Sequence, residues 1–373
     1  MRCLVTGGGT GGHIYPAVAV AEALVRLVPR SRVLYVGTAQ GMERELVPKE
    51  GLNFETIRSS GIRGKSLSSA LRGIWAASLG VGDACRIIRS FKPDVVFGTG
   101  GYVSGPVMLA ARIMAIPRAI QEQNVIPGKT NLVLSRFAHK VFVAWQESVE
   151  HFPRQAKVKV TGNPVRLNLL KPTGKDEARA ALGLGGGPAL LVLGGSRGAR
   201  FLVDLALSLA LEARFSGQML LITGRDYYEN AVAALGAVEQ PGIGGAKSGN
   251  IILQPYVYNM EKAYRACDLV LARAGGMTLA EITALGLPSV IVPSPNVVAN
   301  HQEYNARVLE AAGAAVVVRE GPDTFKQVEE SVRQILHDPE RRAKMAGAAM
   351  GLGRPHAAEQ IARELIALAR GVR

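Results

Sequence analysis

An imidazole beside a glycine-rich loop is the feature of this 373-residue sequence that points most directly to chemistry. Gly7, Gly9 and Gly12 fit the pattern G-x-G-x-x-G after a short apolar run, and His13 follows where a helix is expected to begin. Glycine lets main-chain N–H groups approach a ligand, and a helix N-terminus carries partial positive charge, so we expect this loop to hold an anion. His13 is then placed for proton transfer beside a bound phosphate, or else for capping or packing.

The same loop does not fit a nicotinamide site. Binding of NAD requires an acidic residue about twenty positions further on, at the end of the second strand, to hydrogen-bond the ribose hydroxyls. The second predicted strand covers residues 32–36 and is followed by Gly37-Thr38-Ala39-Gln40, with Glu43 as the first acid beyond it. The first domain is therefore predicted to bind something other than a nicotinamide cofactor.

A second glycine-rich turn runs from Gly98 to Pro106, again after a predicted strand and before a helix. Two anion-binding loops in one domain indicate a phosphorylated acceptor. The candidate acceptor contacts in this turn are Gly100, Gly101, Tyr102 and Ser104. Either glycine cluster taken alone is also consistent with close packing of a helix on a strand.

A third such segment, Arg273 to Glu281, follows the predicted strand at 269–271. Its glycines and Thr278 are expected to open a helix whose first N–H groups hold phosphate. Glu281 falls in the first turns of that helix, where a carboxylate accepts hydrogen bonds from both hydroxyls of a ribose. The alternative is a glutamate placed there only because the helix dipole favours it.

The alternation of strand-like and helical runs predicts an α/β protein with doubly wound parallel sheets and helices on both faces. The opening arrangement of strand, glycine loop and helix occurs again at 189–199, which indicates two similar Rossmann-like domains in tandem. Residues 161–166 read as a hinge, 242–249 as a flexible loop and 356–370 as a closing helix. Strands are predicted at 2–6, 32–36, 95–97, 140–143, 189–193, 219–222, 251–253, 269–271, 289–292 and 315–318.

Ligands of open α/β sheets bind at the carboxyl ends of the strands. Two such domains facing one another would place their glycine loops on opposite walls of one cleft, where one ligand could bridge both.

The composition favours some classes of partner over others. The 44 basic residues outnumber the 30 acidic ones and give a formal charge of +14, which favours phosphorylated substrates or an anionic lipid surface. Nucleic acid ranks last as a partner, because aromatic residues make up only 5% and the sequence has no nucleic-acid recognition motif.

The residues that commonly bind metals or form covalent intermediates are poorly placed for either task. Cys3, Cys85 and Cys267 stand apart, so neither a disulfide framework nor a zinc site is expected. The sequence contains no Asp-x-Asp, its histidines are isolated, and the spacing around Ser196 does not match a nucleophile elbow. We expect no bound metal and no covalent catalysis.

The protein is expected to stay in the cytosol without crossing a membrane. Residues Met1-Arg2 run directly into the first predicted strand, which leaves no room for a signal peptide. A helical run from Leu67 to Leu79 nevertheless has apolar residues at helical spacing with basic residues beside them, so it fits either a membrane surface or a buried core. The candidate membrane contacts are Arg63, Lys65, Leu71, Arg72, Trp75 and Leu79.

Taken together, the motifs resemble the MurG family of bacterial peptidoglycan glycosyltransferases, which transfer N-acetylglucosamine to lipid I. The resemblance runs essentially end to end and is highly specific as a set. Its motifs are residues 7–13, 98–106, Glu122-Gln123-Asn124, 162–166, 194–199, 273–281, His301-Gln302 and Asn305-Ala306.

The resemblance implies a GT-B fold of two Rossmann-like domains. Residues 1–163 would form the acceptor and membrane-binding domain, completed by the C-terminal helix at 356–373. Residues 164–355 would form the domain that binds the donor UDP-GlcNAc. The partners would be UDP-GlcNAc, undecaprenyl-diphosphate-linked MurNAc-peptide (lipid I) and the anionic inner leaflet, where the protein would lie peripherally on the cytoplasmic face.

The resemblance also assigns roles residue by residue. Glu281 would bind ribose, Ser196 with Met277 and Thr278 would contact phosphates, and the backbone of Val257 would read uracil. Gln302 and Asn124 would contact the sugar, and Arg166 would lie near the diphosphate. Thr10, Gly11 and Gly12 would close the cleft from the acceptor domain.

The implied reaction is a single inverting displacement that needs no metal, because a helix N-terminus stabilises the departing UDP. His13 would remove the proton from the acceptor 4-hydroxyl, with Glu122 as the second candidate base. Two alternatives remain open: a non-hydrolysing UDP-sugar epimerase of the same architecture, and a non-catalytic nucleotide-sugar-binding membrane adaptor.

Overall fold

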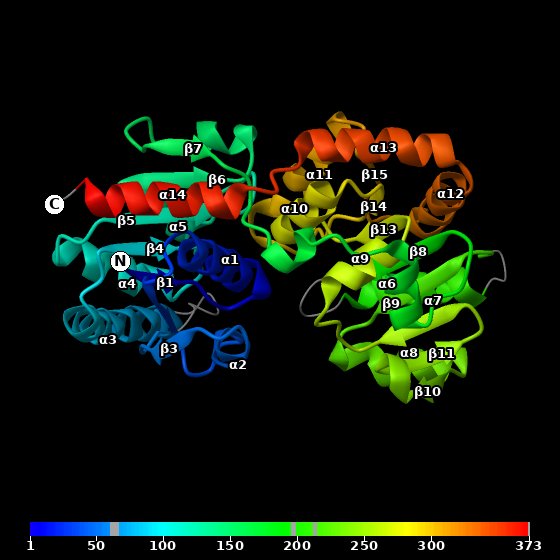
Figure 1. Ribbon diagram of the computed structural model, residues 1–373, viewed down its shortest axis with the longest axis horizontal. Coiled ribbons are helices and arrows are strands. Elements are labelled where there is room, and N and C mark those ends of the chain that lie inside the picture. Colours follow the sequence, from blue (N-terminus) through cyan, green and yellow to red (C-terminus); the bar gives the residue numbers. More distant parts are fainter. Residues whose placement is uncertain (60–66, 195–198, 212–214, 372–373) are drawn as a thin grey trace. The chain divides into compact units, whose positions relative to one another are not determined.

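The computed structural model describes residues 1–59, 67–194, 199–211 and 215–371. The chain forms two compact units, Met1–Leu167 with Arg354–Arg373 and Asn168–Gly353 (Figure 1). The domain boundaries expected from the sequence, after residues 163 and 355, lie within a few residues of these divisions.

The first unit is built on a seven-stranded sheet in the order β3-β2-β1-β4-β5-β6-β7, in which every neighbouring pair is parallel. Its elements are β1 (Arg2–Thr6), α1 (Gly11–Leu27), β2 (Arg32–Gly37), α2 (Glu43–Lys49), β3 (Asn53–Thr56), α3 (Leu67–Phe91), β4 (Val95–Gly98), α4 (Ser104–Ile113), β5 (Arg118–Glu122), α5 (Lys129–Ser135), β6 (Lys140–Val143), the 3-10 helix η1 (Gln146–His151), β7 (Val158–Val160) and α14 (Ala357–Arg370). The 3-10 helix η2 (Leu167–Leu170) lies where the chain passes to the second unit.

Alternate residues of these strands serve two separate cores. Val5 and Phe97 face the core that α1 and α14 cover, where Ile361 and Leu365 of α14 are fully buried. Leu4 and Val96 face the other core, beneath α3, α4 and α5. The C-terminal helix therefore belongs to the first unit, beside α1 (Figure 1).

The second unit has an eight-stranded sheet in the order β10-β11-β12-β9-β8-β13-β14-β15. Its elements are α6 (Lys175–Leu182), β8 (Ala189–Leu193), α7 (Arg200–Leu211), β9 (Gln218–Ile222), η3 (Arg225–Tyr227), α8 (Tyr228–Leu235), β10 (Val238–Gln240), η4 (Pro241–Ile243), β11 (Gly245–Ser248), β12 (Ile251–Gln254), α9 (Met260–Ala266), β13 (Leu269–Ala272), α10 (Gly276–Leu285), β14 (Ser289–Ile291), η5 (Val298–Asn300), α11 (His301–Ala311), β15 (Ala315–Val317), α12 (Thr324–His337) and α13 (Pro339–Leu352).

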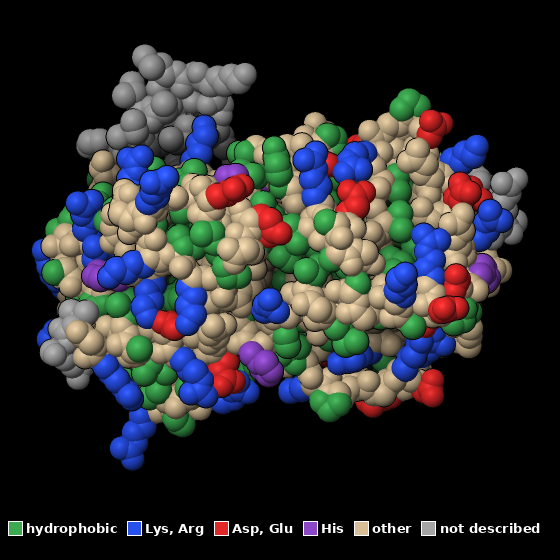
Figure 2. Space-filling model, turned by 90° about the horizontal axis from the view of Figure 1, so that it is seen from above, with side chains coloured by type: hydrophobic (Ala, Val, Ile, Leu, Met, Phe, Trp, Pro, Cys, Tyr) green, Lys and Arg blue, Asp and Glu red, His purple; other side chains and the backbone are tan. Residues whose placement is uncertain are grey.

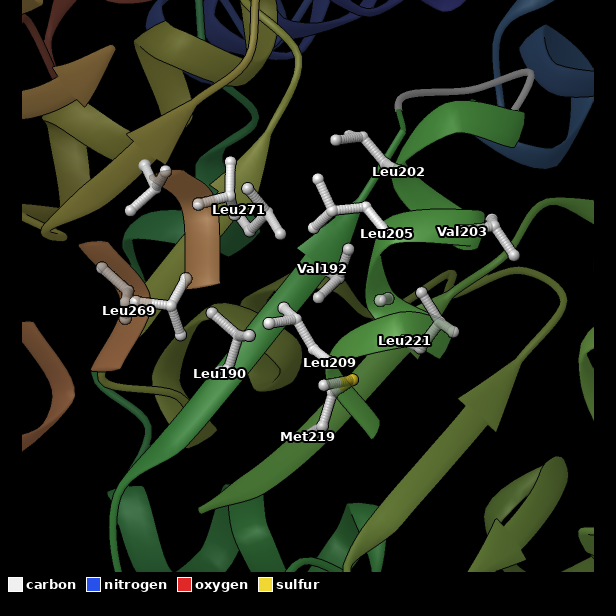
Figure 3. Packing of buried hydrophobic residues seen from close by; sticks show 14 of the residues in the cluster. Leu190, Val192, Leu202, Val203, Leu205, Leu209, Met219, Leu221, Leu269 and Leu271 are labelled. Atoms are coloured by element: carbon white, nitrogen blue, oxygen red, sulfur yellow. The ribbon is translucent and has the colours of Figure 1, made fainter. Parts of the chain in front are cut away.

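Strand register brings the apolar residues of this sheet together. Leu190 pairs with Met219 and with Leu269, while Val192 pairs with Leu221 and with Leu271, so all six point to one face. Figure 3 shows them packed against residues of α7 such as Leu205 and Leu209. Burial of this continuous apolar surface supplies the main stabilisation of the unit.

One expectation about local structure was wrong. Residues 242–249 do not form a flexible loop, because β11 pairs antiparallel with both β10 and β12, and Gly245 and Ala246 are buried.

Helix α1 begins at Gly11, since the Thr10 carbonyl accepts hydrogen bonds from the His13 and Ile14 amides (3.1 and 3.2 Å). Pro16 therefore lies inside the helix and His13 lies in its first turn.

Basic side chains are scattered over the face of the molecule that Figure 2 shows. On the face in Figure 2, Lys and Arg side chains are spread among hydrophobic and uncharged ones. Across the described part of the chain, no helix combines the length and the apolar character needed to cross a membrane.

Candidate functional site: two glycine loops, a histidine and a helix N-terminus

Two loops of the first unit, at the carboxyl ends of β1 and β4, meet main chain to main chain. Gly101 has a φ of +79°, and a Cβ there would lie 2.3 Å from the Gly8 carbonyl oxygen. Gly100 has a φ of +103°, and its Cβ would lie 3.1 Å from the His13 ring. Both positions therefore need glycine, because an added side chain would be strained and would also push the two loops apart.

His13 is held by the second of these loops. Its Nδ1 lies 2.9 Å from the Thr99 carbonyl oxygen, and the Thr99 hydroxyl donates to the His13 carbonyl (2.6 Å). A carbonyl only accepts, so the neutral ring carries its proton on Nδ1 and keeps the Nε2 lone pair. Within the described residues Nε2 has no hydrogen-bond partner, and the ring is half-buried, which is the arrangement of a general base.

A fully buried carboxylate supports the first glycine loop. Glu43, the first residue of α2, accepts hydrogen bonds from the Gly9 amide (3.2 Å), the Thr38 amide (3.1 Å) and the Thr38 hydroxyl (2.7 Å). The Thr38 hydroxyl also lies 3.3 Å from the hydroxyl of Tyr102. Glu43 thus connects Thr38, after the second strand, to the first glycine loop, and Thr38 in turn reaches the second. Sequence reasoning missed this role.

Tyr35 on β2 also holds the first glycine loop, because its hydroxyl donates a hydrogen bond to the Gly7 carbonyl (2.7 Å). Burial, and to a smaller extent the charge of Glu43, raise the pKa of Tyr35 well above its usual range. The phenol therefore stays protonated and remains a donor.

Glu122, the second candidate base, is fully engaged in structural hydrogen bonds. Its carboxylate is buried and accepts from the main-chain amides of Gln123, Asn124 and Gly128 (3.0 Å each) and from the side chain of Asn131 (2.8 Å). The Asn124 side chain donates to it as well (3.1 Å). These five hydrogen bonds occupy both carboxylate oxygens, whereas His13 Nε2 has no described partner, so the geometry favours His13 as the base.

The Ser104 hydroxyl forms hydrogen bonds within its own turn. Its buried hydroxyl donates to the Gly100 carbonyl (2.7 Å) and accepts from the Gly100 amide (3.2 Å), which closes the turn at the start of α4. Gly100, Gly101 and Tyr102 form the rest of that turn.

Arg166 lies over the ring of Tyr15, with 4.5 Å from its guanidinium carbon to the ring centroid, and is mostly buried. Tyr15 follows His13 by two positions on α1, whose N-terminus is formed by Thr10, Gly11 and Gly12. Arg166 is therefore held against α1, close to the glycine loop that precedes this helix.

In the second unit, the candidate nucleotide site lies at the carboxyl end of β13, where α10 begins after the extended Gly275. The first turn of α10 holds Met277, which is buried, and Thr278, which is half-buried. Glu281 is half-buried one turn further along, and its Oε2 accepts a hydrogen bond from the hydroxyl of Tyr264 on α9 (2.7 Å). The helix N-terminus and the oriented carboxylate together suit a phosphate and a ribose.

Helix α11 holds the loops on either side of this site. The buried Asn305 side chain donates to the Ala274 carbonyl (3.0 Å), just before α10, and Gln302 Oε1 accepts from the Ser294 amide (2.8 Å), just after β14. Because the Gln302 oxygen is occupied, its amide nitrogen is the part that can donate to a ligand. Val257 follows β12 and is buried, and Ser196 lies outside the described residues.

The cysteines offer no nucleophile in the cores. Burial, with smaller effects of neighbouring charges, raises the pKa of Cys3 and of Cys267 to about 12, so both remain thiols. Among the residues with described positions, no three His, Cys, Asp or Glu side chains are grouped to hold a metal ion.

The structure describes only some of the expected membrane residues. Arg63 and Lys65 lie outside the described residues, as do the side chains of Leu71, Arg72 and Trp75 within α3. Leu79 is half-buried, so a purely exposed stripe does not extend to it.

Comparison with known families accounts for both units. The glycosyltransferase family 28 N-terminal domain matches residues 3–143, and the glycosyltransferase family 28 C-terminal domain matches residues 189–361. Two curated relatives carry the name UDP-N-acetylglucosamine–N-acetylmuramyl-(pentapeptide) pyrophosphoryl-undecaprenol N-acetylglucosamine transferase. The one from Thermoanaerobacter sp. (strain X514) is 44% identical, covering 97% of this chain and 98% of its own. The one from Moorella thermoacetica is 43% identical, covering 98% of each chain.

Solved structures agree on the architecture. A crystal structure of Acinetobacter baumannii MurG superposes with a TM-score of 0.73 at 27% identity, covering 98% of this chain and 99% of that one. A UDP-N-acetylglucosamine 2-epimerase reaches a TM-score of 0.67 at 14% identity, covering 100% and 97%, which shows a shared fold alone. The expected GT-B fold is confirmed. By both family matches and by its identity to these transferases over nearly its whole length, the chain belongs to glycosyltransferase family 28 and, within it, to the MurG family of N-acetylglucosaminyltransferases.

Proposed function

We propose that this protein transfers N-acetylglucosamine from UDP-GlcNAc to the 4-hydroxyl of the MurNAc residue of lipid I, with inversion, and so forms lipid II. The observation that carries this proposal is the 44% identity, over 97% of the chain, to a transferase named for that donor and acceptor. Similarity of fold does not carry it, because a UDP-N-acetylglucosamine 2-epimerase has the same architecture.

In the first unit, His13 acts as the general base. Its Nε2 accepts the proton of the acceptor hydroxyl while the oxygen attacks the anomeric carbon of the donor, and the bond from that carbon to the UDP oxygen breaks. The Thr99 carbonyl, 2.9 Å from Nδ1, then accepts a hydrogen bond from the imidazolium that forms. The amides of the two glycine loops bind the diphosphate of the acceptor.

In the second unit, α10 and its flanking loops bind the donor. Glu281, oriented by Tyr264, accepts hydrogen bonds from the ribose hydroxyls, and the first amides of α10 contact the diphosphate. The Val257 main chain contacts the uracil, and Gln302 donates to the sugar. The resemblance to the MurG family further assigns Asn124 to the sugar, Arg166 to the diphosphate and Ser196 to a phosphate.

Departure of UDP is assisted by the positive end of α10 rather than by a divalent cation. The helix has ten residues, and its first N–H groups, after the extended Gly275, are the donors that we assign to the diphosphate. Transfer should therefore proceed without an added metal.

The first unit docks peripherally on the cytoplasmic leaflet, where the polyprenyl acceptor lies. Support comes from α4 and α5, whose side chains Leu109, Ile113 and Val133 are exposed, Ile113 by 64%. The exposed basic residues Arg112 and Arg136 lie on or just after the same helices. Apolar side chains among cations favour an anionic lipid surface.

Incubation of the protein with labelled UDP-GlcNAc, a short-chain lipid I analogue and EDTA tests the reaction directly. We expect labelled lipid II at a rate unchanged by EDTA. The H13A variant should lose about 10²–10⁴-fold in kcat, as expected for removal of a general base, and should still bind UDP. His151→Ala in the same unit, on η1, is the matched control and should keep its activity.

The other possible results of this experiment would each remove part of the proposal or favour a different function. An H13A variant as active as the wild type removes His13 as the base, and loss of activity in EDTA removes the metal-free mechanism. Conversion of UDP-GlcNAc without acceptor would favour the epimerase, and donor binding without any turnover would favour the adaptor.

The E281Q variant tests the donor site. Weaker hydrogen bonding to the ribose hydroxyls affects the bound donor and the transition state equally, so KM for UDP-GlcNAc should rise about tenfold while kcat stays within about twofold. Glu310→Gln on α11, an exposed glutamate paired with Arg319, is the control and should leave both constants unchanged. A normal KM in E281Q would show that the ribose is bound elsewhere.

Sedimentation with vesicles that contain anionic phospholipid tests the docking surface. The I113E variant should bind vesicles about tenfold more weakly than the wild type, because a charge replaces an inserted apolar side chain. The control L211E changes a similarly exposed leucine (61%) of the second unit and should bind normally. Equal binding by all three proteins would contradict docking through α4.

A further inference from the structure

The Thr99 carbonyl that binds His13 has a second hydrogen-bond donor. Gln123, the residue after β5, is 3% exposed, and its Nε2 lies 2.7 Å from the Thr99 oxygen. The imidazole N–H and the glutamine N–H thus share one acceptor, whose two lone pairs are both used.

The orientation of the Gln123 amide follows from its neighbours. The described hydrogen-bond partners of its Nε2 are three oxygen atoms that accept from it: the Thr99 carbonyl, the Gln121 carbonyl (3.4 Å) and Gln121 Oε1 (2.5 Å). Gln123 Oε1 is buried and accepts no hydrogen bond from the described residues. Among the described residues, the hydrogen bonds of the Gln123 side chain are therefore all donated by its nitrogen, and its oxygen has no partner.

Two more buried amides hold Gln123 in this position. Gln121 Nε2 donates to the Asn163 side-chain oxygen (2.6 Å), which leaves its own oxygen to face Gln123. Asn163 Nδ2 in turn donates to the Gln123 main-chain carbonyl (3.0 Å). Asn163 follows β7, and the preceding Gly162 amide is bonded to the Val143 carbonyl (3.2 Å). A closed set of amides thus connects the end of the sheet to Thr99 and His13.

We propose that Gln123 is a positioning residue for proton transfer, which holds the Thr99 carbonyl so that the His13 ring keeps Nε2 directed at the acceptor hydroxyl. Gln121 and Asn163 fix Gln123. This inference rests on the proposed role of His13 as the base. Gln123 itself is buried behind Thr99 and acts only through that carbonyl.

Gln123→Met tests the proposal, because methionine keeps the length and volume of the side chain and removes the N–H donor. We expect kcat of transfer to fall about tenfold or more, since a small displacement of a catalytic group has effects of this size, while KM for UDP-GlcNAc stays within about twofold. Gln218→Met is the matched control: Gln218 also hydrogen-bonds main chain, through its Oε1 to the Gly185 amide, but at the amino end of β9 in the second unit. Its kcat and KM should stay unchanged.

A double-mutant cycle separates positioning from a general loss of structure. In the H13A background, Gln123→Met should lower the residual single-turnover rate by less than about twofold, because the group it positions is gone. An equal loss in both backgrounds, or a kcat within twofold of wild type in Gln123→Met alone, would overturn the positioning role. If H13A itself is fully active, the proposed base is wrong instead.

Asn163→Ala covers the case in which Gln123→Met fails to fold. It leaves Gln123 and Thr99 in place and removes the support behind them, so a smaller loss, again in kcat and again dependent on His13, is expected. A loss of the same size in the H13A background would contradict the proposal.

Discussion

The hydrogen bond between His13 Nδ1 and the Thr99 carbonyl is the interaction on which the proposed chemistry depends. It joins the two glycine loops of the first unit, fixes which ring nitrogen carries the proton and leaves Nε2 as the acceptor. Its geometry exists only because Gly100 and Gly101 allow the second loop to lie against the ring and against Gly8. The glycines therefore allow a close approach of one loop to the other, in addition to the approach of main chain to an anion that we propose.

Buried polar groups at the carboxyl ends of the strands keep these loops rigid. Glu43 and Glu122 are both buried, and each uses its carboxylate to accept hydrogen bonds mainly from main-chain amides and neighbouring polar side chains of the loops. Burial of a charge is unfavourable unless hydrogen bonds of this kind compensate it. Glu43 consequently fixes the first glycine loop, and Glu122 fixes the loop that follows β5, so both loops are held in place by the protein itself.

Much of the fold could be predicted from the sequence, because apolar strands alternate with helices and glycine loops follow them. The shorter and more polar strands could not. Strand β5, with Arg118, Gln121 and Glu122, has a polar sequence that gains its burial from the neighbouring strands and from α4 and α5. Strands β10 and β11 are stabilised by pairing at a sheet edge.

The candidate site likewise contains some residues that the sequence reveals and others that it does not. His13 and Glu281 could be found because each lies next to a glycine loop that begins a helix. The roles of Glu43, Gln123 and Asn163 could not, because their partners Gly9, Thr99 and Gln121 are distant in the sequence and meet them only in the folded sheet. Glu122 looked like a possible base until its donors were known, because the sequence does not show that the loop after β5 folds back to surround its carboxylate.

Nitrogen NMR of the histidine rings in ¹⁵N-labelled protein, with H13A to assign the signal, tests the central claim most directly. The account predicts that neutral His13 has its proton on Nδ1 and an unprotonated Nε2. A neutral ring with the proton on Nε2 would contradict it, because that nitrogen could then not accept the proton of the acceptor hydroxyl.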